Sequence, residues 1–123
     1  QEGVVYDELI DFSDFYPTLA ELAGRDEAHD GQSFLPLLIG KPYQEKESVF
    51  VHYDLRMGPG KHEYHDRFAR DKQFKLYEDG RFYHVPSDEL EQDTIGTRLT
   101  WDVIQIKNKL KELMDQAPEW REL

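Results

Sequence analysis

Apolar residues recur at steps of three and four near the start of the chain: Phe12, Phe15, Leu19, Leu22 and Ala23. This spacing is typical of one helix face, and we expect a helix over about residues 14–23. Ser13 is suited to cap its first turn and Gly24 to end its last one. The apolar run SFLPLLIGK at 33–41 predicts a short helical turn buried against this helix.

The middle of the chain is rich in β-branched and aromatic residues, which favour strands. The segment ESVFVHY at 47–53 predicts one strand, and RFAR at 67–70 begins an extended run that enters a hairpin. Residues 54–66, between these segments, lack periodicity and predict a long loop. At the tip of the hairpin, Asp79-Gly80 is suited to the two positive-φ positions of a type I′ turn.

A two-residue turn determines which side chains of the hairpin share a face. Counting outward from it gives an apolar face of two facing pairs, Leu76 with Tyr83 and Phe74 with Val85. The other face is mixed and pairs Lys75 with His84 and Tyr77 with Phe82. Because a hairpin alone is marginal in water, we expect its apolar face to lie on a helix or join further strands.

A second helical pattern begins after Thr100, with apolar residues again on one face: Trp101, Ile104, Leu110, Leu113 and Met114. We expect this helix to end before Pro118 and to cover the apolar face of the hairpin through Trp101 and Ile104. The order of elements predicts an α+β fold. It would be a small antiparallel sheet of about three or four strands packed against a C-terminal helix, preceded by one or two short helices.

Composition narrows the classes of partner. The 123 residues carry 26 acidic and 15 basic side chains, a net charge of -11, so we expect no binding to nucleic acid or anionic membranes. No apolar run approaches the ~18 residues that would suggest a membrane span. The chain has no cysteine, which excludes disulfides, thiolate metal sites and a cysteine nucleophile. Its length suits one domain with a modest core.

The loop region carries the most suggestive polar side chains: His52, Tyr53, Asp54, Arg56, Lys61, His62 and His65. Cations, hydrogen-bond donors and an aromatic ring at a strand end suit recognition of a polyhydroxylated or anionic ligand. An ordinary polar loop explains the same residues, and both interpretations stay open on chemistry alone. His62, Glu63 and His65 also resemble part of a metal site. Because a loop fixes no ligand geometry, polar residues that face solvent or substrate are favoured there.

Two further groups have a functional and a structural interpretation. Asp88, Glu89 and Glu91 could act as paired carboxylates in acid–base chemistry. They follow the hairpin in a polar turn with no apolar wall to raise a pKa, so a solvated turn is favoured. Tyr77 and Phe82 could form a stacking platform, but packing between neighbouring strands is favoured.

Four parts of the chain carry motifs that occur together, in this order, in one family of hydrolases. DFYPTL at 14–19 with LAG at 22–24 resembles an Asp-x-x-Pro-Thr helix that ends in Ala-Gly. DGQSFLPLLIG at 30–40 resembles an Asp-Gly-x-Ser-x-x-Pro-x-x-x-Gly block. RFARDKQFKLY at 67–77 resembles an arginine-to-lysine strand, and FYHVPSDELEQ at 82–92 resembles a segment with Tyr-Asp-Leu, Asp-Pro and Glu. Together they resemble the C-terminal portion of the sulfatases, members of the alkaline phosphatase superfamily.

The chain departs from the family at several positions. His84 stands where the family usually has Asp, and Glu89 stands where Pro usually follows Asp88. Sulfatases of this kind use a formylglycine made within a Cys/Ser-x-Pro/Ala-x-Arg motif, beside a calcium ion held by the N-terminal domain. The four serines of this chain all lack that context: Ser13, Ser33, Ser48 and Ser87. The resemblance therefore implies no catalytic residue, metal ligand or cofactor here, with calcium and formylglycine in a missing N-terminal catalytic domain.

The resemblance implies that residues 1–44 end the catalytic-domain region and residues 45–123 form the C-terminal sulfatase subdomain. This part of a sulfatase supports and shapes the substrate cleft, so we expect no sulfatase turnover by the chain alone. In the full-length protein, the loop that begins at His52 would reach toward a sulfated carbohydrate or aryl sulfate. The expected partner is the N-terminal catalytic domain of the parent sulfatase, which would be periplasmic or secreted.

Without that domain, apolar side chains of the first helical region should be exposed and favour self-association. They are Phe12, Phe15, Leu19 and Phe34. One alternative is a non-enzymatic carbohydrate-binding or interaction module that never belonged to a sulfatase. A third possibility is a small metal-dependent hydrolase that uses His62 and His65.

Overall fold

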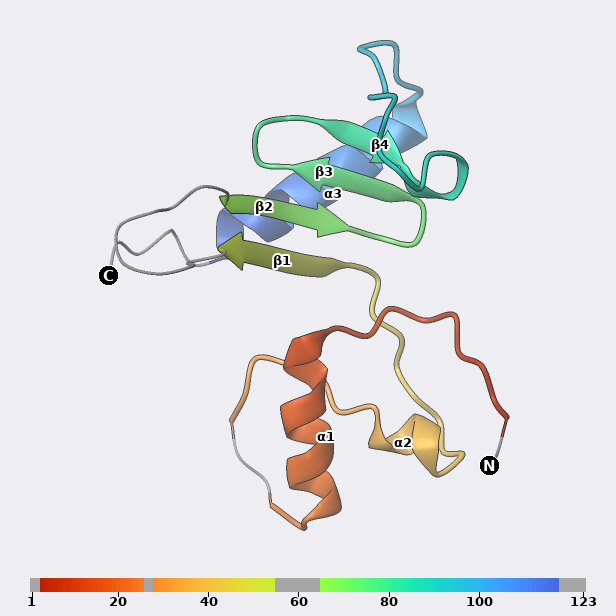
Figure 1. Ribbon diagram of the computed structural model, residues 1–123, viewed down its shortest axis with the longest axis vertical. Coiled ribbons are helices and arrows are strands. Elements are labelled where there is room, and N and C mark those ends of the chain that lie inside the picture. Colours follow the sequence, from red (N-terminus) through yellow and green to blue (C-terminus); the bar gives the residue numbers. More distant parts are fainter. Residues whose placement is uncertain (1–2, 26–27, 55–64, 118–123) are drawn as a thin grey trace. The chain divides into compact units, whose positions relative to one another are not determined.

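The computed structural model (Figure 1) describes residues 3–25, 28–54 and 65–117. The chain divides into two compact units, Gln1–Glu47 and Ser48–Leu123, which we call the helical unit and the sheet unit. Each unit is described by itself below.

The helical unit contains the 3-10 turn η1 (Phe12–Asp14), the helix α1 (Phe15–Leu22) and the short helix α2 (Leu35–Leu38). Both predicted helical segments are confirmed. The cap prediction was half right, because Asp11 rather than Ser13 accepts the first backbone hydrogen bond, from the Ser13 N–H at 2.8 Å. Gly24 does end α1, with φ of 72° and the following N–H of Arg25 donating to the Ala20 carbonyl.

The centre of the helical unit is a buried carboxylate. Asp14 is 0% exposed and accepts hydrogen bonds from the Lys46 ammonium at 2.6 and 2.8 Å and from the Gln32 N–H at 2.7 Å. Gly31 lies so close to η1 that an added Cβ would be 2.0 Å from the Ser13 carbonyl oxygen. Polar contacts between distant segments thus hold α1 to the chain that follows it.

The sheet unit has four antiparallel strands in the order β1-β2-β3-β4, and the helix α3 (Trp101–Gln116) covers one face (Figure 1). The strands are β1 (Val49–Asp54), β2 (His65–Arg70), β3 (Phe74–Tyr77) and β4 (Phe82–His84), and the 3-10 turn η2 (Val85–Ser87) follows. The predicted α+β fold is confirmed, and α3 ends before Pro118 as expected. Of the helices in the described ranges, none has the length and apolarity that a membrane crossing requires.

The predicted register of the β3–β4 hairpin was wrong by one residue. Leu76 pairs with Phe82, and the Tyr77 N–H donates to the Arg81 carbonyl, which leaves a three-residue loop. Within this loop Gly80 has a positive φ of 93°. Asp79 does not, since Glu91 is the only non-glycine residue with a positive φ in the described ranges. A type I′ turn would need a positive φ at Asp79 as well.

This shift changes which aromatic residue enters the core. The core cluster consists of Ala69, Phe74, Leu76, Phe82, Leu110 and Met114. Tyr83 pairs with Lys75 and lies on the opposite face, and Val85 begins η2 rather than extending the strand. The helix also packs differently from the prediction, since Trp101 and Ile104 are 72% and 40% exposed.

Candidate functional site

Four of the predicted binding residues lie at the end of the sheet where β1 stops and β2 begins: His52, Tyr53, Asp54 and His65. Strand pairing brings them together, with Asp54 directly opposite His65. The other three, Arg56, Lys61 and His62, lie outside the described residues. Contact of this set with a substrate therefore stays a prediction.

The register divides these residues between the two faces of the sheet. His52 pairs with Arg67, whose guanidinium donates to the Met114 carbonyl of α3 at 3.4 Å. His52 therefore belongs to the face that α3 covers. Tyr53 is the next residue along the strand and points to the opposite face. Both side chains are exposed, so a ligand that touches both must lie across the strand ends.

At the same end of the sheet, ion pairs connect the start of β2 to the β3–β4 turn. Arg67 donates to Glu78 at 2.8 Å, and Arg81 donates to Asp66 at 2.7 Å. The Arg81 guanidinium also lies over the Tyr77 ring, 4.0 Å from its centroid. These two arginines join β2 to the β3–β4 turn, so their charge is engaged in holding the scaffold together.

The face opposite α3 carries a second network. The Glu91 carboxylate accepts hydrogen bonds from the Lys75 ammonium and the Tyr77 hydroxyl, each at 2.5 Å. Burial, together with the hydrogen bond to Glu91, raises the pKa of Tyr77 above its ordinary value. Burial acts against ionisation of Glu91, but the bonds from Lys75 and Tyr77 outweigh it and lower its pKa. Tyr77 is thus a neutral donor. It forms no stacking platform with Phe82, which lies in the core on the other face.

Two of the carboxylates that follow the hairpin, Asp88 and Glu91, accept hydrogen bonds from within the sheet unit. Asp88 accepts hydrogen bonds from the N–H groups of Gln92 and Asp93, both at 2.9 Å. Glu91 is not simply solvated as expected, because it is the acceptor for Lys75 and Tyr77. These contacts stabilise the segment that follows η2.

Formylglycine and calcium, which the sulfatase resemblance assigns to another domain, can be compared with the residues that the sequence and the described structure provide. No serine lies in a formylglycine motif and there is no cysteine. Among the residues that the structure describes, no group of three or more His, Cys, Asp or Glu side chains could hold a metal ion. His62 and Glu63 of the predicted partial metal site lie outside the described residues.

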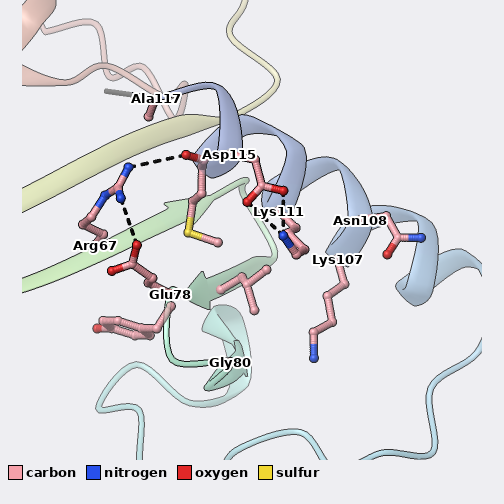
Figure 2. A pocket seen from close by; sticks show the side chains of 11 residues that line it. Arg67, Glu78, Gly80, Lys107, Asn108, Lys111, Asp115 and Ala117 are labelled. Atoms are coloured by element: carbon pink, nitrogen blue, oxygen red, sulfur yellow. Dashed lines mark hydrogen bonds and ion pairs between the residues drawn. The ribbon is translucent and has the colours of Figure 1, made fainter. Parts of the chain in front are cut away.

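The sequence did not predict a pocket that lies at the end of the sheet unit where β2 begins. It lies between the β3–β4 turn and the middle and C-terminal part of α3 (Figure 2), with Arg67 and Glu78 on one side and Lys107 and Lys111 on the other. The only sequence signal is the spacing of Lys107 and Lys111, one helical turn apart. Finding the pocket requires knowing which face of the hairpin meets α3.

The fold is similar to parts of larger solved structures. The structure of BT4656 in complex with its substrate D-glucosamine-2-N,6-O-disulfate matches with a TM-score of 0.61 and 23% identity, over 84% of this chain and 22% of that chain. A candidate sulfatase from Bacteroides thetaiotaomicron VPI-5482 matches with a TM-score of 0.60 and 23% identity, over 83% of this chain and 23% of that chain. No family model and no curated protein sequence matches significantly. Most of this chain therefore matches a segment that makes up less than a quarter of each of these proteins.

Proposed function

We propose that this chain is the C-terminal portion of a sulfatase and that it supports and shapes the substrate cleft. The observation that carries the proposal is the fold match, in which 84% of this chain corresponds to only 22% of a protein solved with a disulfated glucosamine substrate. The four motif segments of the sequence support the same family. Bond cleavage belongs to the missing catalytic domain, where formylglycine and calcium would supply the nucleophile and the metal.

The helical unit has the exposed apolar surface that such a missing domain would cover. The side chains of Phe12, Phe15, Leu19 and Leu22 are 93%, 49%, 62% and 67% exposed. Phe34, which was expected in the same patch, is instead half-buried and packs edge-on against Phe15. The four exposed side chains recur at steps of three and four, so they form a stripe along η1 and α1. Large contiguous apolar surface is characteristic of an interface. The stripe is therefore the proposed contact with the N-terminal catalytic domain, and in its absence it favours self-association.

The proposed role of the sheet unit is to hold the substrate loop. Its strands and ion pairs fix the positions of Asp54 and His65, from which residues 55–64 depart. In the proposed enzyme, His52, Tyr53, Asp54, Arg56, His62 and His65 would contact the substrate. A sulfated carbohydrate is favoured over an aryl sulfate because the substrate of the first structural neighbour is a sulfated sugar.

The test is to express the full reading frame and, separately, residues 1–123, and to assay both on glucosamine 6-sulfate and on 4-nitrophenyl sulfate. We expect turnover by the full-length protein, which is periplasmic or secreted in this proposal, and none by residues 1–123. An upstream sequence without a formylglycine motif and with an unrelated domain would contradict the proposal. It would favour the non-enzymatic carbohydrate-binding module instead.

Substitutions in the full-length enzyme test the role of the loop. We expect His52→Ala and Arg56→Ala to raise KM for the sulfated sugar about tenfold or more, since each removes a polar contact to an anionic substrate. Glu112→Ala is the matched control, because this exposed residue lies on α3 and does not line the pocket. An unchanged KM in both loop variants would remove these residues from the substrate site.

A further inference from the structure

The pocket of the sheet unit is large enough for a small ligand. Its volume is about 470 Å³, within the range from about 300 Å³ upward that ligand pockets occupy. Leu76 and Met114 contribute apolar surface, and the wall at the β3–β4 turn includes Gly80. A Cβ at Gly80 would find no atom within 4 Å, so the turn leaves open space beside the pocket. An amphipathic ring of the size of one sugar residue suits this combination.

The cations that line the pocket differ in how they are engaged. Arg67 is paired with Glu78 at 2.8 Å, and Lys111 with Asp115 at 2.6 Å. Lys107 is different. In the part of the chain that the structure describes, its ammonium lies over the Phe82 ring, 5.2 Å from the centroid, and has no carboxylate partner. Figure 2 shows Lys107 extending from α3 toward the side of the turn that carries Gly80.

An ammonium group at the wall of an otherwise charge-balanced pocket leaves one net positive charge there. The chain as a whole is acidic, with a net charge of -11. At physiological ionic strength, charges beyond about 8 Å are largely screened, so Lys107 acts on a ligand in the pocket more than the distant acids do. The pocket therefore attracts an anion, while the remaining surface disfavours anion binding elsewhere.

The position of the pocket relates it to the proposed substrate loop. Arg67 is two residues from His65, where the described part of β2 begins, and the Glu78 N–H donates to the Arg67 carbonyl at 2.9 Å. The pocket and the loop therefore lie at the same end of the sheet unit. An extended polymer held at one could reach the other.

We propose that this pocket binds an anionic sugar residue, with Lys107 contacting its sulfate or carboxylate group. For its biological role, as a further contact for a sulfated glycan, this inference rests on the proposed function. Binding itself does not depend on sulfatase activity. Sulfate esters and uronate carboxylates share the chemistry that the ammonium recognises.

The experiment is a titration of residues 1–123, followed by NMR, with glucosamine 6-sulfate, glucuronate and N-acetylglucosamine in separate arms. We expect saturable shifts of amide signals in 76–81 and 107–117 with at least one anionic sugar, and none with neutral N-acetylglucosamine. The anion that binds more tightly identifies the source of the charge. Lys107→Gln should raise its Kd about tenfold, the loss of one charge-assisted contact.

Lys109→Gln is the matched control. It makes the same charge change two residues away on the same helix, but Lys109 does not line the pocket, so Kd should stay within about twofold. Equal weakening by both variants, or the absence of saturable shifts with either anionic sugar, would overturn the inference. Saturable binding together with a full-length protein that lacks sulfatase activity would overturn the proposed function and leave the pocket assignment in place.

Discussion

The helical unit and the sheet unit are stabilised by different physical means. In the sheet unit, Phe82 and Leu110 are each 1% exposed and pack between the sheet and α3. In the helical unit, the Asp14 carboxylate is fully buried, and Lys46 and backbone N–H groups satisfy it. Burying apolar side chains gives a net gain, whereas the attraction within a buried ion pair is largely offset by its desolvation cost.

The two units also differ in where their apolar side chains lie. In α1 the buried residues are Pro17, Thr18 and Ala20, all small or compact, while the larger Phe15, Leu19 and Leu22 are exposed. A helix that turns its larger apolar residues outward gains little from its own unit. We therefore expect the sheet unit to be more stable by itself than the helical unit, because the larger apolar side chains of α1 are exposed.

The largest expected effect is the loss of the sheet-unit core. Phe82→Ala should lower the free energy of unfolding of this unit by about 3–5 kcal/mol, the cost of truncating a fully buried aromatic side chain. Chemical denaturation followed through the NMR signals of the strands measures the change. Trp101→Ala is the control, because its side chain is 72% exposed and its loss should cost much less. Equal effects would contradict the register in which Phe82 faces α3.

The next effect tests the close contact inside the helical unit. A methyl group at residue 31 would meet the Ser13 backbone at 2.0 Å, so Gly31→Ala must displace η1. We expect a loss of about 1–3 kcal/mol, confined to the signals of the helical unit. Gly96→Ala is the matched control, since a Cβ there meets no atom within 4 Å. A Gly31→Ala variant of unchanged stability would show that the hydrogen bonds of Asp14 with Lys46 and Gln32 tolerate movement of η1.

A smaller effect concerns the apolar stripe. Phe12→Gln together with Leu19→Gln should weaken self-association of residues 1–123 about tenfold or more, because both side chains are mostly exposed and contribute apolar contact area. Analytical ultracentrifugation measures the dissociation constant. Leu90→Gln serves as the control, since Leu90 is 78% exposed but lies on the sheet unit. A monomer at all concentrations would remove self-association from the proposal and leave the catalytic-domain contact to be tested.

Local patterns were sufficient for the elements but not for how they pair. Helical spacing and Gly24 located α1, and Pro118 marked the end of α3, because these signals act within a few residues. The hairpin register depended on choosing between Phe82 and Tyr83 for the core, and two adjacent aromatic residues give no preference. Asp79-Gly80 is also compatible with either loop length. A one-residue slip exchanges the faces of a strand, so this single choice moved the predicted core.

For the candidate site, too, local patterns predicted some features and not others. His52, Tyr53 and His65 were expected to gather around one loop at a strand end, and the pairing of β1 with β2 brings them to one end of the sheet. The loop bounds of 54–66 were too wide, because Asp54 ends β1 and His65 begins β2. The pocket depends on contact between the β3–β4 turn and α3, and no local pattern reports such a contact. The Asp14–Lys46 pair, with partners 32 positions apart, is equally invisible to local spacing.

The smallest expected effect is a dependence on pH of the stability of the helical unit, which has a polar centre. Burial raises the pKa of Asp11, but hydrogen bonds from Lys46 and Ser13 outweigh it and hold the pKa below its ordinary value of 3.8. A carboxyl group with a lowered folded-state pKa contributes stability above its unfolded pKa and loses it as the pH falls through the folded pKa. The contribution of Asp11 to the helical unit should therefore be complete above about pH 5 and fall progressively below about pH 4.

Because Asp11 is partly exposed, solvent screening should keep this change below about 1 kcal/mol. Amide hydrogen exchange of α1 as a function of pH measures it. Asp11→Asn should flatten the acid dependence of the α1 amides, because the amide side chain does not titrate. Asp102→Asn, a carboxylate in the first turn of α3, should leave the α1 amides unchanged. If Asp11→Asn retains the full acid dependence, the pairing of Asp11 with Lys46 does not stabilise the helical unit, and its polar centre reduces to Asp14 and the backbone groups that bind it.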